Sequence, residues 1–282
     1  MIRDSASYHE VDVLVPSEAH NWRRKLQGQN LLRMTVGKLL PRHSLATLGV
    51  ARVAGRIGDE EAIAVIRRLR SRFFEQQPAG VVLEANTQYA DLADLLPRAF
   101  PGSNTVYVVR DPRGWVRSLM NRRDSVYTRR DPRSWFPHTR VRPHHTGERA
   151  LAARWGRMPL FEKLAWSWSA RHSHVLPRLA GEPRIRVVRY EDLFEGEEKA
   201  AHFRAMLEFV TSFPDGCQAP FAFNPAILGK RSHSTRDGAF PHWRDWSPEL
   251  ARSLDELCGE AMRPFGYGSE PEWTAKLRRA GG

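Results

Sequence analysis

The sequence predicts an α/β protein built on a central parallel sheet flanked by helices. Three short β-branched apolar runs, Val81 to Leu83, Val106 to Val109 and Ile185 to Val188, are typical of strands buried on both faces. Helical patterns lie between and around these runs. Strands that alternate with helices indicate a parallel sheet, and such sheets bind ligands at the carboxyl ends of their strands.

Each predicted strand ends abruptly in polar residues. Glu84 and Asn86 follow the first strand, Arg110 follows the second, and Tyr190 and Glu191 come just after the third. Because the carboxyl ends of parallel strands meet at one edge of a sheet, we expect these side chains to line one cleft.

Apolar residues at helical spacing predict two amphipathic helices. We expect Asp59 to cap the first helix and Ser247 to cap the second, with Pro248 at the first helical position of the second. The apolar faces consist of Ala62, Ile66, Leu69 and Phe73 in the first helix and Leu250, Leu254, Leu257 and Ala261 in the second.

The chain is strongly basic, with a formal net charge of +12 over 282 residues. Only 6 of its 44 basic residues are lysines. Arginine binds carboxylates, sulfates and phosphates with paired donors, so the surplus suggests an anionic partner. A general preference for arginine over lysine in the source genome explains the bias equally well.

The cysteine spacing and the hydropathy limit the cellular location and the cofactors that the sequence predicts. Cys217 and Cys258 lie far apart and follow no spacing typical of a disulfide framework or a metal site. No apolar run approaches the ~18 residues of a membrane span. We expect a cytoplasmic protein with reduced cysteines, no metal and no membrane partner.

A long basic segment interrupts the α/β pattern. We interpret residues 1–282 as a single domain with a basic lid or insertion at about 121–160, because long segments without a clear period are commonly functional or disordered. Within it, Arg130 to Trp135 repeats the pattern of Arg110 to Trp115 without a preceding strand, which favours a turn. His144 and His145 lack a third ligand at fixed spacing, so a metal site is not expected.

The stretch VYVVRDPRGWVRS, residues 106 to 118, has the features of an anion site. Arg110 ends a strand, Asp111 is a helix N-cap candidate and Pro112 suits the first helical position. A helix N-terminus and an adjacent arginine attract an anion, and Ser118 adds a hydroxyl donor two turns into the helix. In the alternative interpretation, Arg110 pairs with a carboxylate and Ser118 is a packing residue.

Arg110 and Ser118 also carry a resemblance to the sulfotransferases that use 3′-phosphoadenosine 5′-phosphosulfate. In that family a strand, an arginine and a helix with a serine eight positions on hold the 3′-phosphate of the nucleotide. The stretch RVVRYEDL, residues 186 to 193, is similar to the family strand that ends in Tyr-Glu-Asp-Leu. The resemblance implies that Tyr190 contacts the nucleotide near its adenine and that Asp192 caps a helix.

Two further stretches extend the resemblance over residues 81 to 273 in the family's order. GKRSHSTRDGAFPHWRDWSPEL, residues 229 to 250, is similar to the basic loop that closes over the 3′-phosphate, which implies Lys230 and Arg231 as phosphate ligands and Trp243 as a packing residue. VVLEANTQY, residues 81 to 89, is similar to the Glu-Lys-Thr-Pro strand end of heparan-type members, although Ala85 replaces the lysine. The resemblance implies a P-loop-like three-layer fold.

The family's first motif, a glycine-rich loop that holds the 5′-phosphosulfate, does not precede residue 81. The opening residues resemble the end of the helix that follows that loop. We therefore expect roughly 20 to 30 further residues upstream, about the length of a strand, a loop and a helix. The other possibility is natural loss of the loop.

The implied reaction transfers a sulfuryl group to a hydroxyl or amine of a small-molecule or glycan acceptor, with no metal. It needs a general base near the acceptor proton. By the resemblance Glu10 is the first candidate, Glu84 the second, and His9 is a third by proximity.

Two other functions remain open at this stage. The first is a nucleotide-binding relic that keeps the 3′-phosphate pocket without transferring sulfate. The second is a basic nucleic-acid-binding protein, which the net charge suggests, although no recognised binding motif is present and the arginines form no single stripe. We expect no nucleic-acid partner.

Overall fold

The structure is a computed structural model that describes residues 5–9, 40, 42–77, 79–122, 126–128, 135–213, 216–229 and 239–279. It is a mixed α/β protein, so the predicted class is confirmed. No helix in these ranges has the length and the apolar character needed to cross a membrane.

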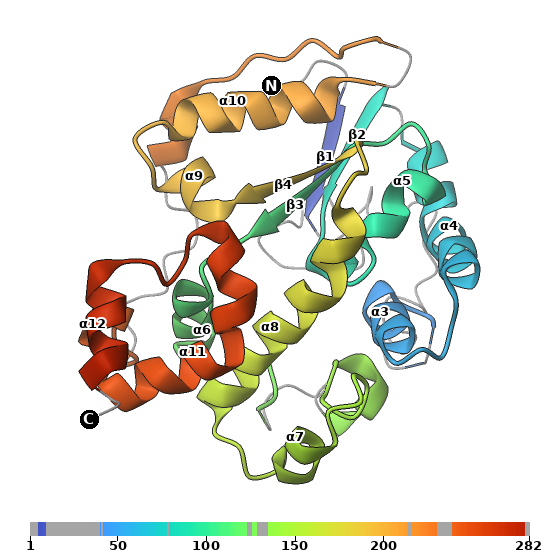
Figure 1. Ribbon diagram of the computed structural model, residues 1–282. Helices are drawn as coiled ribbons and strands as arrows, with labels where there is room; N and C mark the ends of the chain where they lie inside the picture. The colour runs from blue at the N-terminus through green and yellow to red at the C-terminus, as the bar shows by residue number, and fades with distance from the viewer. Residues whose placement is uncertain are drawn as a thin grey trace.

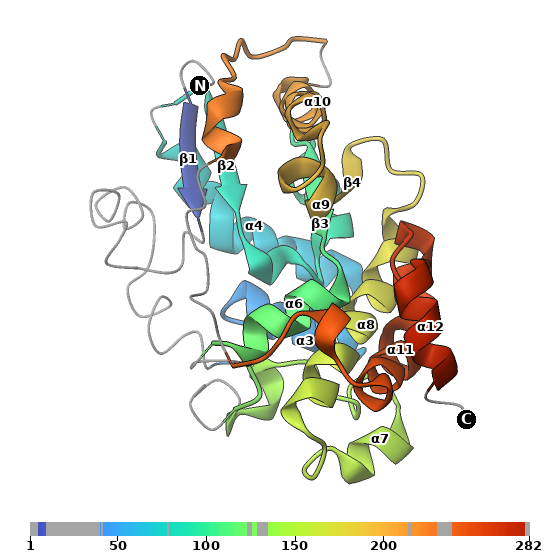
Figure 2. The ribbon, with the colours of Figure 1, turned by 90° about the vertical axis from the view of Figure 1, so that its left-hand side faces the viewer.

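The described strands form two parallel pairs. β1 (Ser5–His9) pairs with β2 (Val81–Ala85), and β3 (Thr105–Val109) pairs with β4 (Ile185–Arg189). The three predicted strands are thus confirmed, each one or two residues longer than its apolar run. The expected burial on both faces was wrong for β3 and β4, where Val108 is 45% exposed and Val187 is 37% exposed. Figure 2 shows the pairs lying apart, and in the described part of the chain they are two sheets rather than the single sheet expected.

The β1 strand corrects the interpretation of the opening residues as the end of a helix. Ala6 and Tyr8 are both buried, and the Tyr8 ring packs edge-on against Phe73 at 5.1 Å between centroids. The Tyr8 hydroxyl donates to Gln77 Oε1 at 2.5 Å. The sequence signal was weak because Ala6 and Tyr8 are the only apolar residues of this short strand.

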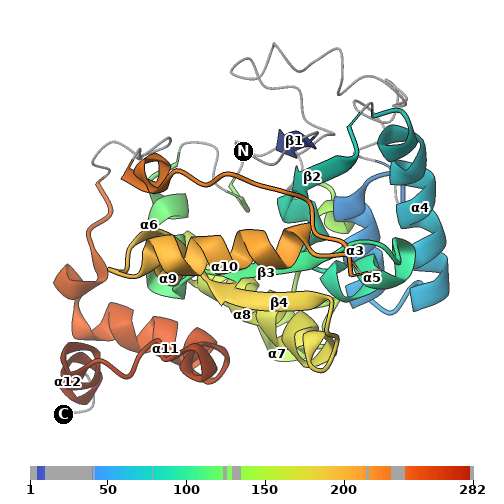
Figure 3. The same ribbon diagram turned by 90° about the horizontal axis from the view of Figure 1, so that it is seen from above.

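The β3–β4 pair lies between two long helices (Figures 1 and 3). α8 (Leu160–Leu179) crosses one face of the pair and α10 (Lys199–Thr211) covers the other. Tyr107 and Val109 of β3 enter the largest apolar cluster with Leu164 and Trp168 of α8. The strand ends at Val109, the last residue of its apolar run, because that side chain is buried in this cluster and the next residue is charged.

Helices α3 (Leu45–Val53) and α4 (Asp59–Glu75) build a second apolar cluster. The predicted face of α4 is confirmed: Ala62, Ile66 and Phe73 are buried and Leu69 is partly buried. The predicted cap was wrong, because Gly58 precedes the first helical residue and Asp59 lies inside the helix. The carboxylate of Asp59 instead accepts from Arg52 Nε at 2.9 Å.

The C-terminal helices pack around the start of α6 (Pro112–Met120). α11 (Pro248–Met262) begins as predicted, with Pro248 at its first position and the Ser247 hydroxyl accepting from Leu250 N at 3.3 Å. Its fully buried face runs through Ala251, Leu254, Cys258 and Met262, so Leu250, Leu257 and Ala261 lie at the edge of the core. α12 (Pro271–Arg279) follows.

Shorter elements connect these layers. The helices are α5 (Leu96–Ala99), α7 (Arg149–Arg154) and α9 (Tyr190–Phe194), and the 3-10 turns are η3 (Thr87–Tyr89), η4 (Ala93–Leu95), η6 (Pro137–Thr139), η7 (Pro225–Gly229), η8 (Trp243–Asp245) and η9 (Arg263–Phe265).

The described part of the predicted lid packs against α8. The Tyr127 hydroxyl donates to Val141 O at 2.7 Å and hydrogen-bonds Ser167 Oγ of α8 at 3.1 Å. Trp155 lies between the Tyr127 and Trp166 rings, each at 5.1 Å between centroids. Arg130, in the repeated hexamer, lies outside the described residues.

Candidate functional site

Arg110 and Tyr190 meet at the carboxyl edge of the β3–β4 pair. The strands are in register at Val109 and Arg189, so the residues that follow each strand emerge side by side. The Arg110 Cζ atom lies 4.5 Å from the centroid of the Tyr190 ring. Two side chains that the sequence placed 80 residues apart on one predicted edge are therefore in cation–π contact.

The Arg110 guanidinium has no ion pair or hydrogen bond with any residue that the structure describes. Its backbone is held in place, because Trp168 Nε1 donates to Arg110 O at 3.0 Å. The contact with the Tyr190 ring gives no N–H group of the guanidinium a hydrogen-bond acceptor atom, so these donors are available. The alternative in which Arg110 pairs with a carboxylate is thus not supported within the described part of the chain.

The Arg110 guanidinium lies against Gly114 in the first turn of α6. A Cβ built at Gly114 would stand 3.7 Å from Arg110 Nε and 3.9 Å from Nη2. Ser118 lies one turn further along α6, and residues four apart share a helix face. The Arg110 guanidinium therefore lies over the face that carries the Ser118 hydroxyl.

The N-terminus of α6 is already capped by carboxylates. Asp111 is the N-cap as predicted, and its Oδ1 accepts from Arg113 N at 2.8 Å. Glu191 Oε1 accepts from Asp111 N at 3.0 Å, and Pro112 has no N–H to offer. An anion at this edge would therefore be held by the side chains of Arg110 and Ser118 rather than by these first amides.

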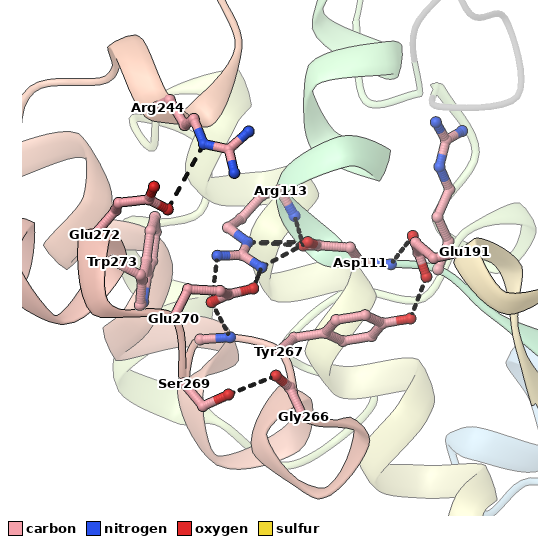
Figure 4. A network of polar contacts seen from close by, with 12 residues as sticks. Asp111, Arg113, Glu191, Arg244, Gly266, Tyr267, Ser269, Glu270, Glu272 and Trp273 are labelled. Atoms are coloured by element: carbon pink, nitrogen blue, oxygen red, sulfur yellow. Dashed lines mark hydrogen bonds and ion pairs between the residues drawn. The ribbon is translucent and has the colours of Figure 1, made fainter. Parts of the chain in front are cut away.

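Arg113 occupies the most heavily paired position around α6 (Figure 4). Its side chain is 1% exposed, its Nε lies 3.0 Å from both carboxylate oxygens of Asp111, and its Nη1 donates to Glu270 Oε2 at 2.9 Å. The guanidinium also lies 4.4 Å from the centroid of the Trp243 ring and 5.0 Å from that of the Trp273 ring, and the two rings contact each other edge-on at 5.8 Å between centroids. The prediction that Trp243 is a packing residue is confirmed, and its indole packs on the Arg113 guanidinium.

Glu191 links this network to the carboxyl edge of the β3–β4 pair. Its second oxygen accepts from the Tyr267 hydroxyl, and Figure 4 shows that hydroxyl pointing at the carboxylate. Burial raises the pKa of the Tyr267 hydroxyl above its ordinary value, and the hydrogen bond and negative charge of Glu191 raise it further. The prediction that Asp192 caps a helix was wrong, because Arg189 is the N-cap of α9 and Asp192 lies within the helix, 3.8 Å from Arg189 Nε.

Glu84 is held in a separate buried cluster. Its side chain is 4% exposed and pairs with Arg70, which is 1% exposed, at 3.1 Å. Tyr89 Oη donates to Glu84 Oε2 at 2.8 Å and Asn86 Nδ2 donates to Oε1 at 2.9 Å. These contacts favour a structural role for Glu84 over the predicted role of general base.

Lys230, Arg231 and Glu10 lie outside the described residues, as does the side chain of His9. The described residues on either side of the basic loop at 230–238 contact α6 and α10. Downstream, Phe240 N donates to Oδ1 of Asn121, the C-cap of α6, at 2.9 Å.

Upstream of residues 230–238, a row of rings connects the chain to Tyr190. Tyr190 packs on Phe194 at 4.8 Å, Phe194 on Phe203 of α10 at 5.9 Å and Phe203 on Phe223 at 5.3 Å between centroids. The upstream flank of the basic loop thus packs on α10, which contacts α9 and its Tyr190, and the downstream flank is tied to α6, which carries Ser118.

The prediction from the sequence did not include the residues that hold this site together, namely Arg113, Glu191, Tyr267 and Glu270. Glu191 was noted as a polar strand end, and Arg113 is one of many arginines. Nothing local marks Glu270, which lies 157 residues from Arg113.

No family model, curated protein or solved structure matches the chain. Among the described residues, no group of three or more His, Cys, Asp or Glu side chains is arranged to hold a metal ion.

Proposed function

We propose that this protein is a sulfotransferase that uses 3′-phosphoadenosine 5′-phosphosulfate, on a P-loop-like three-layer fold. The observation that carries the proposal is the contact between Arg110 and Tyr190, with the guanidinium unpaired among the described residues and lying over the α6 face of Ser118. Arg110 and Ser118 bind the 3′-phosphate, and Tyr190 lies near the adenine.

The available donors suit a phosphate ester. Arginine presents paired N–H groups that match two phosphate oxygens, and a serine hydroxyl adds a third donor. Lys230 and Arg231 complete this grip from the basic loop, whose described flanks contact α10 upstream and α6 downstream.

In the proposed reaction, the acceptor oxygen or nitrogen attacks the sulfur in line. The bond from sulfur to the bridging phosphate oxygen breaks, adenosine 3′,5′-bisphosphate leaves, and the acceptor proton passes to a general base. Positioning and charge stabilisation supply the acceleration. Glu10 remains the first candidate for the base, and the acceptor is a small molecule or a glycan.

The direct test measures binding and transfer separately. We expect calorimetry to show binding of adenosine 3′,5′-bisphosphate, and a radiolabelled cosubstrate to give a sulfated product with an acceptor panel of phenols, amines and glycans. Tight binding without transfer by the full-length protein would favour the nucleotide-binding relic. Absence of nucleotide binding would overturn the proposal.

Gly114 offers a second test of the geometry. We expect Gly114→Ala to retain nucleotide affinity, since its methyl group would meet Arg110 at ordinary contact distance. Gly114→Leu should weaken binding about tenfold, because displacing the guanidinium costs at least one charged hydrogen bond. Calorimetric titration of the pair measures the difference, and equal affinities would show that the guanidinium does not need this face of α6.

A further inference from the structure

The face of α6 that carries Gly114 and Ser118 also carries a second arginine, Arg117. Residues three and four apart are neighbours on a helix surface, so Arg117 and Ser118 both lie one turn beyond Gly114, with Asn121 beyond them. Asn121 fastens Phe240 to this face through hydrogen bonds in both directions, at 2.9 and 3.1 Å. The chain at 240–244 therefore runs beside α6.

Arg117 has no anionic partner among the described residues. Its Nε is buried and makes no hydrogen bond there, although a buried guanidinium N–H without an acceptor is costly. Arg113, one turn earlier on the same helix, contacts two carboxylates. The contrast indicates that Arg117 is built to receive an acceptor that does not belong to the described chain.

His242, the N-cap of η8, comes two residues after Phe240, which Asn121 binds one turn beyond Arg117. Its Nδ1 accepts from Arg244 N at 3.3 Å, which places the proton of the neutral ring on Nε2 and makes that atom a donor. Nε2 has no partner among the described residues. Burial lowers the pKa of His242, with further lowering by Arg117 and Arg244 that Asp245 and Asp111 oppose only in part.

We propose that Arg117 and His242 form a second half of the anion subsite on α6, binding a dianionic oxyanion through the guanidinium and the Nε2–H. Resting on the proposed function, that oxyanion is the 3′-phosphate of the nucleotide, a monoester with two negative charges. Two arginines, Arg110 and Arg117, then match its charge, while the histidine and Ser118 satisfy further oxygens. The subsite selects a terminal phosphate over a singly charged diester.

Inorganic sulfate tests the subsite without the nucleotide, because sulfate stays dianionic throughout the titration range of histidine. We expect sulfate to raise the pKa of His242, followed by NMR of its ring protons, relative to chloride at equal ionic strength. Arg117→Ala should abolish this shift, Arg117→Lys should retain part of it, and the exposed helix variant Arg68→Ala should leave it intact. An unchanged pKa of His242 in the wild type would overturn the inference.

Two nucleotides, one with a 3′-phosphate and one without it, test the assignment to the 3′-phosphate. Arg117→Ala and His242→Gln should weaken adenosine 3′,5′-bisphosphate about tenfold, the loss of a charged hydrogen bond, and leave adenosine 5′-monophosphate unchanged. Equal weakening of both nucleotides would overturn the assignment. If sulfate shifts His242 but neither nucleotide binds the wild type, the proposed function fails and the oxyanion subsite stands.

Discussion

Arg113→Ala is expected to lower the free energy of unfolding by about 3–5 kcal/mol, the cost of removing one partner from a buried ion pair. The substitution leaves the carboxylates of Asp111 and Glu270 facing each other without their shared cation. It also removes the cation that packs against the Trp243 and Trp273 rings. Urea unfolding of the wild type and the variant measures the difference.

Arg68→Ala is the matched control for this substitution. Arg68 is exposed on α4 and makes no ion pair within the described chain, so its loss should change stability by less than about 0.5 kcal/mol. If Arg113→Ala unfolded at the same urea concentration as Arg68→Ala, the Arg113 network would not stabilise the fold.

The contribution of Glu270 should depend on pH. Burial opposes ionisation, but the hydrogen bonds and the charge of Arg113 hold the pKa of Glu270 below its ordinary value of 4.5. A depressed pKa in the folded state gives stability that is fully present above pH 4.5 and is lost as the pH falls through the folded value. Wild type and Glu270→Gln should therefore differ at neutral pH and converge in acid.

Arg110→Ala should have the opposite profile, with weakened binding and preserved folding. We expect the affinity for adenosine 3′,5′-bisphosphate to fall by ~1.5–3 kcal/mol, roughly 10- to 150-fold, for the loss of a hydrogen-bonded charge. Stability should change by no more than ~1 kcal/mol, since the guanidinium loses only its ring contact with Tyr190. Calorimetry and urea unfolding on the same samples separate the two effects.

Ser118→Ala tests the second proposed phosphate ligand, and Arg68→Ala is the control for the loss of an exposed arginine. The serine variant should lose about 1.5 kcal/mol of binding, the lower end of the range for a hydrogen bond to a charged group, and the arginine control should lose none. Equal nucleotide affinity in wild type and Arg110→Ala would refute the assignment of Arg110 to the 3′-phosphate.

The candidate site was predictable where it depends on parallel strands. An apolar run that ends in Arg110 and another that ends before Tyr190 place both side chains at one edge if the strands pair in parallel, and they do. The base could not be predicted in the same way. Glu84 also follows an apolar run, but Arg70 and Tyr89 approach it from α4 and η3, and no spacing in the sequence encodes those contacts.

The sequence alone determined the α/β class, the strands from 81 to 189 and the caps at Asp111 and Ser247, because apolar runs and caps act between near neighbours. Only the tertiary structure decided which arginines are paired. Arg110, Arg113 and Arg117 lie within eight residues on one strand-to-helix turn, yet only Arg113 has carboxylate partners in the described chain. The physical reason is distance in space: an ion pair needs atoms within about 4 Å, and packing of the C-terminal segment brings Glu270 to Arg113 alone.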